Sequence, residues 1–352
     1  MSTGDIPETD CFNRRLRRRV TKMAGKFKAA FALLKSDGKA RRDAHNFKRN
    51  FGATFCCDLC LATQPYKKAP KSLLYSDCND NAAWLFTMIS QSIYEESELL
   101  LSPWLMVPGW SLLSNLFDFM HVCWLGFGRD VAACVIVDLY ARRQIPGNTE
   151  TEAYAMFTAK FQSWCKARNM TKVPFSFTPS SLGADSDKNE YPELASYFKA
   201  VHVHAIVSFL ADTLRERTNV NFHDKCRGTM VWSLQHVART LDGSTWRLDD
   251  AEKDSVLRAG KLFLTCYQSL AAEADREKMK LWKHRPKLHY FWHIMFDNVR
   301  WGLNPVTFDC ASDESYLGKL KAICRNCHGA SLSRSVLLRW RLGLATQFRD
   351  VT

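Results

Sequence analysis

The residues best suited to chemistry stand at the start of a stretch that runs from Asn115 to Tyr140. Asp118 and His121 are three positions apart, so on a helical turn both side chains leave from the same face. A carboxylate and an imidazole held in this way can share a metal ion, a phosphate or each other's proton. The same spacing is typical of a buried Asp–His hydrogen bond that anchors the start of a helix. Spacing alone leaves both interpretations open.

A pair of cysteines indicates a metal site earlier in the chain. Cys57 and Cys60 have the Cys-x-x-Cys spacing of half a structural zinc site. No second pair follows at knuckle spacing, so the other ligands must come from elsewhere, and Cys78, His45 and His121 are the candidates. We expect Cys57, Cys60 and His121 to hold a structural zinc ion. Buried cysteines without a metal are the alternative.

Two histidines lie on one face of a predicted helix near the end of the chain. His289 and His293 are four positions apart, and Pro286 suits the first turn of that helix. Such a pair can bind a metal, but the zinc-protease pattern needs a glutamate after the first histidine, where Tyr290 stands. The pattern therefore argues against a metalloprotease. We predict that both histidines are structural residues that support the site, with Lys287 beside them.

Two acidic residues stand where a metal-binding carboxylate is often found. Asp37 ends an apolar segment and is followed by glycine, which is equally the pattern of an ordinary turn. Glu314 lies in the first turn of a predicted helix, with Asp313 beside it and Lys319 and Lys321 further along. Acids followed by lysines also complement a helix dipole, so this pattern alone indicates no more than a helix.

Composition and charge limit the class of protein. The chain has 352 residues, 46% of them hydrophobic, and a formal net charge of +13. No apolar run reaches the roughly 18–20 residues of a membrane span, and no signal peptide opens the chain. The 13 cysteines lack the regular spacing of a disulfide scaffold, which indicates a reducing compartment. We therefore expect an intracellular protein that is not secreted and has no membrane partner.

A dense basic run near the N-terminus indicates a polyanionic partner. It is typical of a nuclear-import signal or of an arm that contacts phosphates, and a solvated helix face is the alternative. The excess of positive charge favours nucleic acid over a membrane surface. The arginines of this run are Arg14, Arg15, Arg17, Arg18 and Arg19.

Helical periodicity dominates the chain, above all after a segment rich in Ser, Pro and Gly. We predict a basic, partly disordered arm over 1–26, a region over 27–172 that carries the Cys-x-x-Cys and Asp-x-x-His elements, a linker over 173–190, and a helical domain over 191–352. The predicted fold class is mainly α. The sequence indicates no oligomeric state.

Three blocks in this order resemble the C-terminal part of cut-and-paste DNA transposases of the CACTA (En/Spm), Plavaka and KDZ groups. The blocks are Cys-x-x-Cys, then Asp-x-x-His followed by Leu-Gly, then Pro-Lys-x-His-x-x-x-His followed by Glu-x-x-x-Gly-x-x-Lys. The resemblance covers roughly residues 27–340. In this chain the blocks stand at Cys57/Cys60, Asp118/His121 with Leu125-Gly126, Pro286-Lys287 with His289 and His293, and Glu314 with Gly318 and Lys321.

The resemblance implies an RNase H-like catalytic core with a helical insertion, of which this chain would keep a small α/β remnant. In such enzymes three carboxylates bind two divalent metal ions, Mg²⁺ or Mn²⁺, for cleavage and strand transfer of phosphodiesters. The resemblance assigns the catalytic roles to Asp37, Asp118 and Glu314. It assigns nucleic-acid contacts to Lys287, Lys319 and Lys321, and it favours DNA over RNA and a nuclear location.

One element of the resemblance has no counterpart. The first catalytic aspartate should lie on an early strand before Asp37, and residues 1–35 contain no such strand. The chain is therefore expected to be a transposase-derived protein that binds nucleic acid without independent nuclease activity. The alternatives are a divalent-metal-dependent transposase or nuclease, and a helical structural or interaction protein with a zinc-stabilised fold. Whether the chain is an enzyme stays open.

Overall fold

The computed structural model describes residues 34–65, 70–88, 103–107, 109–170, 173–185, 190–215 and 221–349. The chain divides into two compact units, Met1–Phe308 and Asp309–Thr352. The predicted linker 173–190 lies within the first unit, and the predicted domain 191–352 contains the division. The arginines of the basic run, Arg14, Arg15, Arg17, Arg18 and Arg19, lie outside the described residues.

The described part of the first unit is built from helices, so the predicted mainly α class is confirmed. Strand pairing in the described residues is limited to isolated bridges, and an RNase H-like remnant stays a prediction. The α-helices are α1 (Gly38–His45), α3 (Gly128–Ala141), α4 (Glu150–Ala167), α5 (Ala200–Arg215), α6 (Phe222–Gly243), α7 (Asp250–Arg276) and α8 (Pro286–His293). Short 3₁₀ turns cover Lys71–Leu73, Ala83–Thr87, Pro103–Met106, Leu112–Ser114, Ser180–Leu182, Val299–Trp301 and Pro305–Phe308, and π-helical turns cover Met120–Phe127 and Ile294–Asn298.

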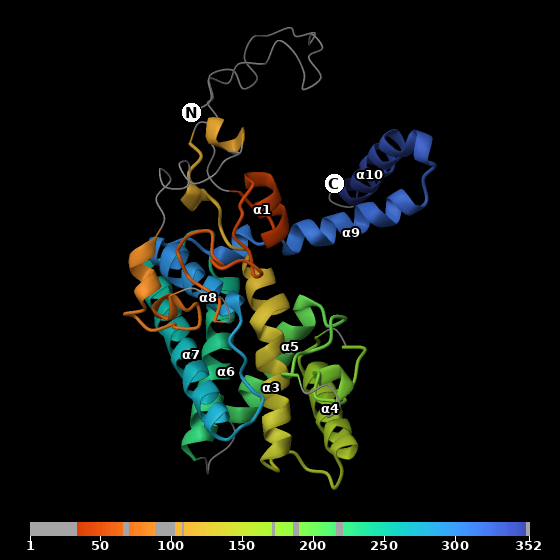
Figure 1. Ribbon diagram of the computed structural model, residues 1–352. Coiled ribbons are helices and arrows are strands. Elements are labelled where there is room, and N and C mark those ends of the chain that lie inside the picture. Colours follow the sequence, from red (N-terminus) through yellow and green to blue (C-terminus); the bar gives the residue numbers. More distant parts are fainter. Residues whose placement is uncertain are drawn as a thin grey trace. The chain divides into compact units, whose positions relative to one another are not determined.

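The helix α3 forms the centre of this unit. Its apolar run from Val131 to Ile136 is fully buried, because the run leaves no polar face for solvent. Helix α3 packs on α5, α5 packs on α4 and α6, and α6 forms an antiparallel hairpin with α7 (Figure 1). Helix α8 packs on the π-helical turn that precedes α3, which brings a late block of the chain against the Asp118–His121 block.

The helix starts follow from local capping chemistry. The side chain of Thr149 accepts a hydrogen bond from the N–H of Glu152 at 3.2 Å at the start of α4. Helix α7 opens with a full capping box, in which Asp249 and Glu252 each accept a bond from the other's backbone N–H, at 2.8 and 2.9 Å. These caps place the first turns of the long helices at defined residues.

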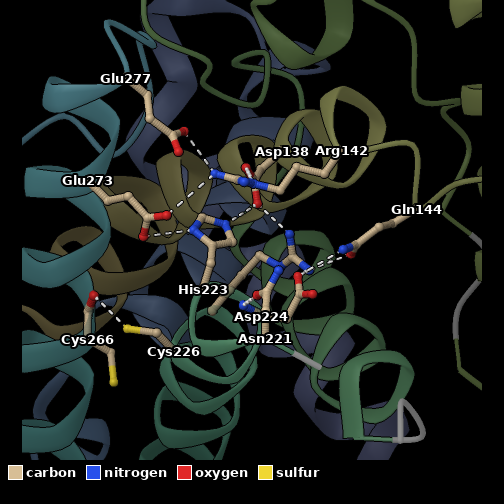
Figure 2. A network of polar contacts seen from close by, with 11 residues as sticks. Asp138, Arg142, Gln144, Asn221, His223, Asp224, Cys226, Cys266, Glu273 and Glu277 are labelled. Atoms are coloured by element: carbon tan, nitrogen blue, oxygen red, sulfur yellow. Dashed lines mark hydrogen bonds and ion pairs between the residues drawn. The ribbon is translucent and has the colours of Figure 1, made fainter. Parts of the chain in front are cut away.

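A buried polar network joins α3, α6 and α7 (Figure 2). Asp138 of α3 lies 2.8 Å from His223 Nε2 and is also paired with Arg227, while His223 Nδ1 lies 3.0 Å from Glu273 Oε2. Burial opposes the charge of Asp138, but His223 and Arg227 outweigh burial and lower the pKa of Asp138 to about 2. Each buried charge of this network has an oppositely charged partner, so none is left unpaired in the apolar core. Because the partners come from different helices, the network also fixes the register of these helices.

The second unit is a helical hairpin of α9 (Ala311–Arg325) and α10 (Leu332–Arg349), joined through a 3₁₀ turn at Gly329–Ser331. The rings of Tyr316 and Trp340 meet edge to face at 4.4 Å between the two helices. No residue of α9 is buried, and neither is any residue of α10 whose burial the structure describes.

Candidate metal centre and the pocket beside it

Four side chains from two distant segments converge in the first unit. One ligand atom from each of Cys57, Cys60, His289 and His293 can be chosen so that all four lie within 4.8 Å of one another, and all four residues are buried. The donors are two thiols and two imidazoles, which is the set found in Cys₂His₂ zinc sites. These four residues could hold a metal ion such as zinc.

The distances between the donor atoms fit a tetrahedral ion. With Zn–S near 2.3 Å and Zn–N near 2.05 Å, tetrahedral geometry places sulfur and nitrogen about 3.6 Å apart and two nitrogens about 3.3 Å apart. The Cys57 Sγ–His293 Nε2 distance is 3.4 Å, Cys60 Sγ lies 3.2 Å from His289 Nε2 and 3.6 Å from His293 Nε2, and the two Nε2 atoms are 3.1 Å apart. The cluster needs only a few tenths of an ångström of expansion to accept the ion.

The cysteine half of the cluster is a tight turn held by hydrogen bonds to its carbonyl oxygens and to the sulfur of Cys57. The N–H of Leu59 donates to Cys57 Sγ at 3.4 Å, and the guanidinium of Arg49 donates to the carbonyl oxygens of Cys57 and Cys60 at 3.3 and 2.9 Å. Between the cysteines, Asp58 forms a buried ion pair with Arg41 at 2.6 Å. These bonds orient both sulfur atoms toward the histidines before any ion is bound.

Helix α8 supplies the histidine half. The four-residue spacing places both imidazoles on one face, and His293 Nδ1 lies 2.5 Å from Asp297 Oδ2, so its Nε2 is directed to the cluster. The Nδ1 of His289 is buried and has no hydrogen-bond partner among the described residues. The ring of Trp84 covers His289 edge-on at 4.2 Å and helps to close the site from solvent.

The electrostatics of the cluster favour a thiolate beside an imidazolium. Burial opposes ionisation of Cys57, but hydrogen bonding from Cys60 and the charge of His293 lower its pKa well below the usual value of a thiol. Burial also opposes protonation of His293, yet Cys57 and Asp297 raise its pKa to about 9. A divalent cation would take the place of the proton that these groups share.

The cluster differs in membership from the site predicted from the sequence. Cys57 and Cys60 belong to it, but His121 does not, because its ring is bonded to Asp118 in a neighbouring pocket. His289 and His293, which the sequence placed in a supporting role, lie at the ligand positions instead. The signal that could have found them is the four-residue histidine spacing paired with the cysteine spacing, although 229 positions separate Cys60 from His289.

A pocket of about 250 Å³ adjoins the metal cluster and is lined by residues of the Asp-x-x-His and Pro-Lys-x-His blocks together with Asp37. Phe117 and Tyr290 form its wall, stacked at 4.2 Å, and the hydroxyl of Tyr290 donates to the carbonyl of Cys56 at 2.6 Å. This wall therefore connects the pocket to the cysteine turn. The charged and titratable lining residues are Asp37, Lys39, Arg41, Arg42, Asp118, His121 and Lys287.

A short parallel pairing brings the two aspartates of this pocket together. Leu34 and Asn115 form an isolated parallel bridge, and the N–H of Leu34 donates to the carbonyl of Ser114 at 2.9 Å. Asp37 and Asp118 each follow their bridge residue by three positions, so the parallel register carries both to the same edge. Asp37 accepts a bond from the N–H of Ala40 at 2.7 Å and caps α1. Asp118 accepts from the ring and the backbone N–H of His121.

Lys287 reaches the pocket because Gly126 has no side chain. The Nζ of Lys287 donates to the carbonyl of Leu125 at 3.0 Å, and a Cβ added to Gly126 would lie 2.4 Å from Lys287 Cδ. Burial, followed by the charge of Arg129, lowers the pKa of Lys287. The Leu-Gly of one motif block thus makes room for the lysine of another.

The remaining predicted residues lie in the second unit. Glu314 is exposed in the first turn of α9, where its N–H donates to the carbonyl of Cys310 at 2.8 Å. Lys319 and Lys321 are exposed further along the same helix.

Comparison with known proteins assigns the chain to no family. The chain matches no family model, and neither the curated proteins nor the solved structures contain a significant match to it. Among the described helices, none is both long and apolar enough to cross a membrane.

Proposed function

We propose that this chain is a transposase-derived nucleic-acid-binding protein that acts in the nucleus on DNA, with a structural zinc ion and without independent nuclease activity. The observation that carries the proposal is one pocket lined by residues of two of the blocks on which the resemblance rests, together with Asp37. Asp37, Asp118 with His121, and Lys287 come from three parts of the chain, and the Cys/His cluster forms the adjoining layer.

The donor set supports a structural role for the metal. Two thiols and two imidazoles complete a tetrahedral shell, and all four residues are buried, so no open position is left for water or substrate. A closed site of this kind holds segments together. Here it would join the turn at Cys57–Cys60 to helix α8, and α8 carries Lys287 and Tyr290 into the pocket.

The charged residues of the pocket are better placed to bind a phosphate backbone than to hydrolyse it. Lys39, Arg42 and Lys287 line the pocket with positive charge, while Lys39 also pairs with Asp43 at 3.2 Å on the same helix. The two carboxylates are engaged as a helix cap and as the partner of His121. Basic side chains at a rim attract phosphates, and each contact makes affinity depend on salt.

DNA binding measured as a function of salt tests the proposal. In fluorescence anisotropy with a labelled duplex, replacing both Lys39 and Arg42 with glutamine should weaken binding at least about tenfold. It should also reduce the slope of log K against log salt by roughly 1.8, about 0.9 for each lost phosphate contact. The charge-matched control replaces Lys160 and Lys166 of α4 with glutamine. Equal losses of DNA affinity in the two double variants would show that the pocket does not contact DNA. Absence of DNA binding at low salt would refute the proposed function.

A second candidate is a divalent-metal-dependent nuclease or transposase that uses Asp37, Asp118 and Glu314. The observation that favours it is the parallel register that brings Asp37 and Asp118 to one edge. Nicking of supercoiled plasmid in Mg²⁺ or Mn²⁺ separates the candidates. Nicking by the wild type that Asp37→Asn and Glu314→Gln each abolish would establish the enzyme. No nicking, or equal nicking by wild type and variants, is the result expected from the first proposal.

A further inference from the structure

Two tryptophans of the first unit are exposed side chains on neighbouring loops. Trp246, in the loop between α6 and α7, is 60% exposed, and Trp301, at the end of a 3₁₀ turn, is 78% exposed. The same unit buries Trp84 and Trp282 completely, so the fold has room for indole rings in its core. A large aromatic side chain left in water forgoes the stabilisation that burial would provide.

The two loops are fixed to each other by backbone bonds. Arg247 and Leu303 form an isolated antiparallel bridge, the N–H of Leu248 donates to Gly302 at 2.9 Å, and the N–H of Asn304 donates to Trp246 at 3.0 Å. The tryptophans are therefore held on adjoining segments rather than on independent flexible loops.

The buried side chain of Asn304 also links the two loops. It is fully buried, and its Nδ2 donates to the carbonyls of Leu241 at 2.8 Å and of Thr245 at 2.9 Å. One side chain thus anchors the end of α6 and the loop that carries Trp246. A rigid support of this kind lets an exposed ring bind a ligand without a large loss of conformational entropy.

Each tryptophan stands next to an exposed arginine. Arg247 follows Trp246, and Arg300 precedes Trp301. Among the residues that the structure describes, neither guanidinium lies within ion-pair distance of a carboxylate. Of the acids in the same loop, Asp249 caps α7, and Asp250 pairs with Lys253 at 2.6 Å while the nearby charge of Arg247 also helps to lower the pKa of Asp250. These two loops therefore carry two exposed indole rings and two exposed guanidinium groups.

We propose that Trp246 and Trp301, with Arg247 and Arg300, form a platform that binds unpaired DNA by stacking its bases on the indole rings and pairing its phosphates with the guanidinium groups. Every base has an aromatic face, so such a platform binds single strands with little dependence on sequence. The proposal rests on the proposed function in taking DNA as the ligand. It adds that the chain holds a single-stranded segment at a surface separate from the lining of the pocket.

Binding of a labelled 16-nucleotide single strand and of the matching duplex to the full chain tests this inference. We expect Trp246→Ala and Trp301→Ala each to weaken single-strand binding by roughly 5- to 100-fold, with duplex affinity within about twofold of wild type. Phenylalanine at either position should restore most of the single-strand affinity, because it keeps an aromatic face. The matched control is Trp232→Ala, which removes a 39% exposed tryptophan of α6 that stacks on His236 at 5.1 Å.

The outcomes separate this inference from the proposed function. Retained duplex binding with single-strand affinity unchanged by the double substitution Trp246→Ala/Trp301→Ala would overturn the platform and leave the proposed function intact. Failure of the wild type to bind either DNA would refute the proposed function. A change of oligomeric state in the double variant, measured by light scattering, with unchanged DNA affinity would show that a second copy of the chain occupies this surface and would also overturn the inference.

Discussion

Removal of one histidine from the metal cluster should strongly destabilise the first unit. His289→Ala deletes one of four buried ligands, and structural zinc sites of this type contribute roughly 10–16 kcal/mol of folding free energy. A metal bridge between Cys60 and His289, 229 positions apart, also removes about 5 kcal/mol of loop-closure entropy from the unfolded chain. A whole domain has only about 5–15 kcal/mol of net stability. Loss of even half the metal contribution would therefore remove a large part of the net stability of the unit.

Urea unfolding followed by circular dichroism, with and without a chelator, measures this effect. His289→Ala also loses its packing against Trp84, which alone costs a few kcal/mol, so a single mutant is not decisive. The decisive comparison is additivity. If the histidine acts through the metal, a chelator destabilises the wild type strongly and the variant hardly at all.

The control and the refuting result are specific to this site. His236→Ala removes a half-buried histidine that bonds Ser255 at 2.8 Å, and the chelator should destabilise that variant as much as it does the wild type. A role of His289 as a metal ligand is refuted if the chelator leaves the unfolding midpoint of the wild type unchanged, or if chelator and His289→Ala destabilise the protein additively.

Two further perturbations test the network and the pocket. The pKa of Asp138 is lowered to about 2, so its stabilising charge is complete above pH 4 and is lost as the pH falls from about 4 toward 2. Although burial opposes its charge, hydrogen bonds to Asp138 and Glu273 raise the pKa of His223, so its contribution is complete below pH 6.5 and is lost as the pH rises through the raised value. Unfolding free energy measured across pH should therefore be greatest between about pH 4 and 6.5, and Asp138→Asn should cost about 3–5 kcal/mol at pH 6; a flat profile in wild type would contradict this. Gly126→Ala should displace Lys287 and cost about 1–3 kcal/mol in chemical unfolding, whereas Gly243→Ala, where an added Cβ meets nothing within 4 Å, should be near neutral.

Local patterns predicted the mainly helical fold and the cysteine half of the metal cluster. Helical periodicity is a local property, and the apolar run at Val131–Ile136 became the fully buried centre of α3. Cys57 and Cys60 are three positions apart, so their convergence follows from one turn of the backbone. The sequence wrongly favoured His121 over His289 and His293 as the remaining ligands. These ligands are brought to the cysteines by tertiary packing across more than two hundred residues, which leaves no local pattern.

The register of the aspartates and the buried network had no local signal. Asp37 and Asp118 meet through the parallel bridge of Leu34 with Asn115, and a single bridge leaves no strand pattern in the sequence. Asp138 and Arg227 resemble ordinary helix-surface charges until α3 and α6 pack together, since their pairing spans 89 positions. Such long-range ion pairs are visible only in the folded chain.

The metal cluster brings the cysteine turn together with helix α8, and this helix carries Lys287 and Tyr290 into the pocket. The most direct measurement is the zinc K-edge X-ray absorption spectrum of the purified chain, together with its metal content. We expect one zinc ion per chain with two sulfur neighbours near 2.3 Å and two imidazole nitrogens near 2.0–2.1 Å. A chain without bound metal, or a zinc shell made only of oxygen and nitrogen, would contradict it.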